Sequence, residues 1–133
     1  MELVDQIVFE GRILAYIIPG ASRPNGTVFL TPPEDKQQVG FIVYPSGGTI
    51  ARHVHKRFRR EIEGTSEVLV VRSGRCEVDI YSPDRKLVET KLLEAGDVLV
   101  LVEGGHGFRI LEDTVFLEVK QGPYIGVDDK ERF

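Results

Sequence analysis

The chain has 133 residues, a formal net charge of −4 and a single cysteine, Cys76. This length allows one domain with a substantial core, expected over residues 1–133, and one cysteine excludes an internal disulfide and favours a reducing, cytoplasmic setting. The negative charge argues against general nucleic-acid binding, and neither a secretory signal nor a membrane-spanning apolar stretch is expected.

Short runs rich in Val, Ile, Leu and Phe recur between turns rich in Gly, Pro and Asp, and no segment of ten or more residues has a clean helical period. This pattern predicts an all-β fold. Many short strands at such spacing are typical of a sandwich or barrel. The expected strands are residues 6–18, 27–31, 38–44, 48–55, 67–73, 75–81, 86–93, 97–102, 106–111 and 114–120.

Alternation along these strands assigns side chains to faces, because every second residue of a strand points the same way. Cys76 shares an apolar face with Val78 and Ile80, so it is expected to pack as a small hydrophobic residue. Glu118 and Lys120 alternate with apolar residues and are expected to face solvent. The same is expected of five residues near the chain end: Tyr124, Asp128, Asp129, Lys130 and Arg132.

All three histidines of the chain stand where a metal site could use them. His53 and His55 form an HxH pair, whose members share a face of a strand, and His106 opens a later strand. Neutral imidazole is the commonest metal ligand. The histidines and Glu67 lie on faces that are otherwise small or apolar, as in a dry pocket with a few polar groups.

Two segments carry a family resemblance. The first runs Gly47, five residues, His53-Val54-His55, an intervening stretch, Glu67, six residues, Gly74. The second runs Gly96, five residues, Val102, then Gly104 and His106. They resemble the two motifs of the cupins. The resemblance implies a cupin-type double-stranded β-helix (jelly-roll barrel) that holds one divalent metal through His53, His55, Glu67 and His106, and it makes a homodimer plausible.

The chain departs from the cupin pattern at three places. Eleven residues separate His55 from Glu67, where the family usually leaves three or four, and Glu61 and Glu63 in this insertion are rival carboxylate donors. Val102 stands where the family usually has Pro. The second motif is one residue short before His106, a difference that a Gly-Gly turn can absorb.

Three imidazoles and one carboxylate leave coordination positions open for a substrate, water or dioxygen, and suit Fe, Mn, Ni, Zn or Cu. We therefore expect a small-molecule ligand, polar or anionic. Five basic residues fall within positions 52–60. Of these, Arg57, Arg59 and Arg60 are candidates for a rim that attracts the anionic group, and Phe108 is a candidate pocket wall.

Two alternatives stay open. His53 to Lys56 and Glu67 to Val78 also resemble the sugar-nucleotide 3,4-ketoisomerases, cupin-fold enzymes that need no metal. In that case His53 and His55 would be catalytic, exchanging protons with a sugar-derived ligand, because the pKa of histidine lies near neutrality. Otherwise the chain would be a binding module that holds a small molecule without turning it over.

Overall fold

The computed structural model describes residues 3–133, which form two compact units. One unit runs to Ser22 and resumes at Thr65, and the other is Arg23–Gly64. The expectation of an all-β chain is confirmed, since the regular structure of the described residues is eight strands and one 3-10 turn, η1 (Gly126–Asp129). No helix within residues 3–133 is long and apolar enough to cross a membrane.

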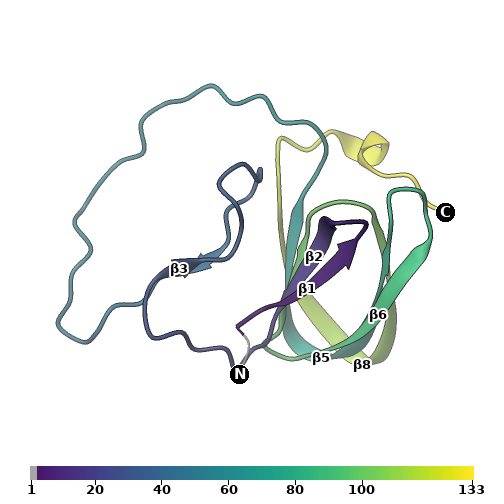
Figure 1. Ribbon diagram of the computed structural model, residues 1–133, viewed down its shortest axis with the longest axis horizontal. Coiled ribbons are helices and arrows are strands. Elements are labelled where there is room, and N and C mark those ends of the chain that lie inside the picture. Colours follow the sequence, from purple (N-terminus) through teal and green to yellow (C-terminus); the bar gives the residue numbers. More distant parts are fainter. Residues whose placement is uncertain (1–2) are drawn as a thin grey trace. The chain divides into compact units, whose positions relative to one another are not determined.

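The first unit is one antiparallel sheet of six strands that curls into a half-barrel (Figure 1). The sheet order is β1-β2-β7-β5-β6, and β8 pairs with the other edge of β5. The strands are β1 (Asp5–Phe9), β2 (Arg12–Ile18), β5 (Glu67–Tyr81), β6 (Leu87–Glu94), β7 (Val98–Leu101) and β8 (Gly105–Lys120).

Strand β5 runs through both halves of the curled sheet, the half with β7 and the half with β6. It pairs with β8 from end to end, whereas its other edge pairs first with β7, from Glu67 to Val70, and then with β6, from Arg75 to Tyr81. The register of the β5–β8 pairing shifts three times between Val71 and Cys76. Such irregularities bend a strand and increase its twist. The bend therefore lies where β5 passes from one half of the sheet to the other.

Gly74 lies within this bend. Its φ of +94° is a conformation that residues with a side chain rarely adopt. A Cβ built on Gly74 would fall against the carbonyl oxygen of Asp113 and 2.6 Å from Cα of Thr114 on β8. Close backbone approach and the positive φ both require glycine here.

Three predictions of strand bounds in the first unit are wrong. Residues 67–73 and 75–81 form one strand, β5, because Ser73 and Gly74 make a bulge and not a turn. Residues 106–111 and 114–120 likewise form the single strand β8. The predicted strand 6–18 is a hairpin, β1–β2, which turns at Glu10 and Gly11, both with positive φ.

The core of this unit lies inside the curl. Cys76 is fully buried in it, as predicted, and burial raises the pKa of its thiol. The core consists of residues from five strands: Ile7, Leu14, Ala15, Ile17, Leu69, Val71, Cys76, Val78, Ile80, Leu93, Leu99 and Leu101.

The second unit, Arg23–Gly64, has little regular structure. Its two strands, β3 (Val28–Phe29) and β4 (Gly40–Phe41), pair antiparallel and replace the longer predicted strands 27–31 and 38–44. The predicted strand 48–55 does not form, and residues 44–64 are all exposed. Alternation in sequence does not create a strand unless another segment accepts its backbone hydrogen bonds.

Candidate functional site

The face that each side chain occupies follows from the pairing of β5 with β8, because directly paired residues share a face of the sheet. Buried Val78 pairs with Phe108, and buried Ile80 pairs with His106. Phe108 and His106 therefore lie on the side of β8 that faces the core.

At the other end of the same ladder, buried Leu69 pairs with Glu118, and Glu67 pairs with Lys120. These three polar side chains also lie on the core-facing side. The paired strands β5 and β8 form a two-stranded ribbon. Its inner face carries polar residues at both ends, and the middle of that face is apolar.

The curl of the sheet brings these two ends together. His106 pairs with Ile80, at the far end of β5 from Glu67. A flat strand of this length would separate the two positions by about 40 Å, at about 3.3 Å per residue. Instead, Nε2 of His106 lies 3.7 Å from Oε2 of Glu67. Both residues were candidates from the sequence, and the fold places them side by side.

Burial shifts the pKa of both members of this pair. The Glu67 side chain is 15% exposed. Burial raises the pKa of Glu67, and a hydrogen bond with the Glu118 carboxyl raises it further, whereas Lys120 and Lys130 oppose this shift. Burial also lowers the pKa of His106, helped by the charge of Lys130 and opposed by that of Glu118. His106 is therefore neutral at physiological pH and keeps a lone pair for a metal or a proton.

Glu118 and Lys120 differ in part from the expectation. Glu118 is exposed, as predicted, but both residues stand on the inner side of β8 beside Glu67, and Lys120 is half-buried. The apolar residues that alternate with them are the ones that point outward, with Leu117 and Val119 about half exposed. At this end of β8 the polar side chains face inward and the apolar ones face outward, the reverse of the usual arrangement. Such departures are common at functional sites.

The prediction that Asp129 faces solvent is wrong, since its side chain is only 13% exposed. Asp129 accepts a hydrogen bond from Oγ1 of Thr65 at 2.8 Å and lies 3.7 Å from Nζ of Lys120. Tyr124 is exposed, as expected, with the Lys120 ammonium 5.6 Å from its ring centroid. Lys130 and Arg132 are exposed, also as expected. The side chain of Asp128 lies outside the described residues.

His53 and His55 belong to the second unit, in the extended and exposed segment that follows Gly48. Nδ1 of His53 lies 2.8 Å from the carbonyl oxygen of Ala51, and the two imidazole rings stand edge to face with centroids 5.4 Å apart. The pair is thus intact as a local feature. Its convergence with Glu67 and His106 stays a prediction.

The other candidates of the second unit are exposed as well. The guanidinium of Arg60 stacks over the ring of Phe58 at 5.5 Å. The carbonyl oxygen of Glu63 accepts a hydrogen bond from Lys36. All of these candidates lie in the exposed segment 44–64: Arg57, Arg59, Arg60, Glu61 and Glu63.

Phe108 lies where a site wall would stand. It is half-buried, packs against the core, and its ring centroid is 6.1 Å from that of His106 and 5.1 Å from that of Phe116. This pair of rings provides an apolar surface beside the imidazole.

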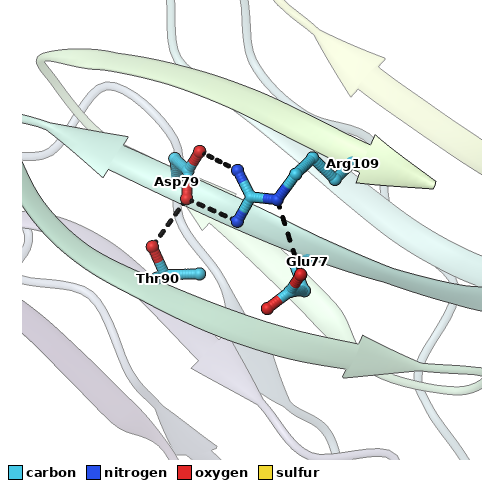
Figure 2. A network of polar contacts seen from close by, with 4 residues as sticks. All are labelled: Glu77, Asp79, Thr90 and Arg109. Atoms are coloured by element: carbon cyan, nitrogen blue, oxygen red, sulfur yellow. Dashed lines mark hydrogen bonds and ion pairs between the residues drawn. The ribbon is translucent and has the colours of Figure 1, made fainter. Parts of the chain in front are cut away.

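One polar network was not predicted (Figure 2). The guanidinium of Arg109 on β8 donates to both carboxylate oxygens of Asp79 on β5, and Oγ1 of Thr90 on β6 donates to the same carboxylate at 2.6 Å. Glu77 adds a contact to Arg109 at 3.4 Å. Arg109, and then Thr90, lower the pKa of Asp79. The network joins three adjacent strands, and only the strand register could have revealed it.

The spacing of His106 and Glu67 suits two ligands of one metal ion. Two ligands about 2.1 Å from a common cation are separated by about 3.4 Å at the tetrahedral angle. The 3.7 Å between His106 and Glu67 is close to this value, and neutral imidazole with carboxylate is a suitable donor set. Within residues 3–133, no three His, Cys, Asp or Glu side chains gather into a complete metal-binding group.

Comparison of the chain with protein-family models, with curated proteins and with solved structures finds no match.

Proposed function

We propose that this chain is a metal-binding protein of cupin type, with a jelly-roll barrel, that acts on a small polar or anionic metabolite in the cytoplasm. Its ligands would be His53, His55, Glu67 and His106. One observation carries the proposal. Glu67 and His106, chosen from the spacing of two separate motifs, meet at 3.7 Å on the inner face of the half-barrel.

The state of the two side chains supports a ligand role. The lowered pKa of His106 favours the neutral imidazole, which binds a cation without first losing a proton. Burial and the hydrogen bond with the Glu118 carboxyl raise the pKa of Glu67, and a bound cation would oppose this shift because it favours the ionised carboxylate. When bound there, a divalent metal supplies Lewis-acid chemistry toward a substrate oxygen.

The protein's own residues would position the substrate. Phe108 and Phe116 offer an apolar wall next to His106. Arg57, Arg59 and Arg60 would attract an anionic group to the site, because a basic patch raises the local concentration of anions. If the protein binds no metal, the alternative is acid–base catalysis by His53 and His55 on a sugar-derived ligand, or ligand binding without turnover.

Metal analysis tests the proposal. Protein purified without a chelating column should contain one divalent metal per chain, and titration calorimetry with Mn²⁺ after chelator treatment should show one site. Changing His106→Ala or Glu67→Gln should weaken this binding at least about 100-fold, because loss of even an outer-shell partner costs 10- to 100-fold.

Glu61→Gln is the matched control, since Glu61 is the rival carboxylate in the exposed insertion. Its metal affinity should equal that of the wild type. If Glu61→Gln or Glu63→Gln lost the metal and Glu67→Gln kept it, the proposed ligand set would be wrong. A wild-type protein without any metal affinity would overturn the metal proposal as a whole and favour the proton-transfer alternative.

A further inference from the structure

Two lysines lie at the Glu67 end of the paired strands β5 and β8. Lys120 is the cross-strand partner of Glu67 and shares its face of the sheet. Lys130 follows Asp129, whose carboxylate lies 3.7 Å from Nζ of Lys120. Neither lysine is among the four proposed metal ligands.

Contacts on both sides of Lys130 attach the tail, residues 121–133, to the rest of the unit. On one side, Asp129 bonds to Thr65 at 2.8 Å, and the backbone N–H of Ser66 donates to Oε1 of Gln121 at 2.7 Å. These contacts attach the start of the tail to the residues that lead into β5. The ammonium is thus carried by a tail that is anchored next to Glu67.

On the other side of Lys130, the last residues pack at the opposite end of the ribbon. The ring of Phe133 meets that of Tyr81 edge to face at 5.1 Å, and the guanidinium of Arg85 stacks over it at 5.2 Å. Arg85 also pairs with Glu131 at 2.9 Å. A Cβ on Gly105 would come within 2.8 Å of the Phe133 ring, so the aromatic ring lies directly against the residue before His106. The tail therefore connects the two ends of the ribbon that meet at the site.

The charges of this cluster leave room for an anion. The carboxylates within it are Glu67, Glu118 and Asp129, and the ammonium groups are Lys120 and Lys130. With a divalent cation bound and all carboxylates ionised, the positive charges exceed the negative ones by one. A ligand with one anionic group neutralises this excess, and an ammonium beside a metal can hold the oxygens that the metal does not contact.

We propose that Lys130, with Lys120, forms an anion-binding subsite beside Glu67 and His106, which takes the carboxylate or phosphate group of a small ligand. The inference rests on the proposed metal-binding function and names the chemical class of its ligand. It also assigns the C-terminal tail a direct part in ligand binding, since the tail carries one of the two ammonium groups.

Titration calorimetry with malonate and with inorganic phosphate on the full-length, Mn²⁺-loaded protein tests the subsite. Lys130→Gln should lower the affinity for the preferred anion about tenfold, equivalent to about 1.4 kcal/mol. Lys130→Arg should restore most of it, a rescue that a merely structural role would not produce. Lys86→Gln is the control, because Lys86 is an exposed lysine that pairs with Asp84, and it should bind as the wild type does.

The Mn²⁺ affinity is measured on each variant first, so that the two proposals can fail separately. If the wild type binds Mn²⁺ but neither anion at millimolar concentration, the subsite is wrong and the metal site stands. If Lys130→Gln binds the anion as tightly as the wild type, the subsite is wrong as well. If the wild type binds no Mn²⁺, the proposed function fails and this inference fails with it.

Discussion

Replacing Gly74 with Ala tests whether the bend of β5 depends on glycine. Two costs add at this position. A non-glycine residue at positive φ costs about 1 to 3 kcal/mol, and the new methyl group would meet backbone atoms of β8, with Cα of Thr114 only 2.6 Å away. Overpacking of this kind costs a further 1 to 3 kcal/mol, typically about 2. We therefore expect Gly74→Ala to lose about 4 kcal/mol of unfolding free energy, a large part of the total stability of an ordinary domain.

Gly11→Ala separates the two costs. Gly11 also has a positive φ, +75°, but nothing lies within 4 Å of the position that its Cβ would occupy. This variant should lose only the conformational part, about 1 to 2 kcal/mol. Urea unfolding followed by circular dichroism measures both variants at one pH. If Gly74→Ala were no less stable than Gly11→Ala, the close approach of β8 at the bend would not constrain the fold, and our explanation of the bulge would be refuted.

The remaining predictions concern the polar network, the cysteine and the tail. Arg109→Ala removes the main cause of the lowered pKa of Asp79. The lowered carboxyl pKa stabilises the fold above the ordinary pKa of 3.8, and this stabilisation is lost as the pH falls through the pKa of the folded state. The melting temperature of the variant should thus fall below that of the wild type at pH 7, and the two should converge in acid; a constant difference would contradict this reading. Cys76 is fully buried with a raised pKa, so a thiol reagent at pH 8 should modify it only at the rate of unfolding, and rapid reaction of folded protein would contradict its place in the core. Phe133→Ala should speed proteolysis of the tail without lowering the melting temperature of the protein by more than a few degrees, and unchanged proteolysis would show that the aromatic contact does not anchor the tail.

The sequence was most informative about chemistry and about strand content. The all-β class and the burial of Cys76 followed from alternation along the strands. Glu67 and His106, which the cupin resemblance proposes as ligands of one site, lie 3.7 Å apart. The continuity of β5 did not follow, because a Ser-Gly pair can form either a turn or a bulge, and the partner strand decides between them. The Asp79–Arg109 network was missed because a pair of this kind depends on register.

The inward position of Lys120 and Glu118 could not be predicted for a different reason. Local alternation assigns apolar residues to the core, and this rule fails where the inner face carries polar residues, as it does at Glu67, Glu118 and Lys120. Residues 48–55 show that alternation can also predict a strand that does not form. Their alternation suits a strand, but a strand forms only with a pairing partner, and nothing in the segment itself specifies one.

The β5–β8 ribbon also fixes the order in which the candidate site can assemble. Tyr81 and Gly105, which pair at one end, are much closer in sequence than Glu67 and Lys120, which pair at the other. Because the entropy lost on closing a loop grows with its length, pairing should begin at Tyr81 and Gly105 and proceed toward Glu67. His106 thus takes its place early, and Glu67 reaches it only when the whole ribbon is paired. A partly folded chain would have the Tyr81–Gly105 end of β5 and β8 paired and no Glu67–His106 contact, so ligand binding at this pair would be a property of the finished fold alone.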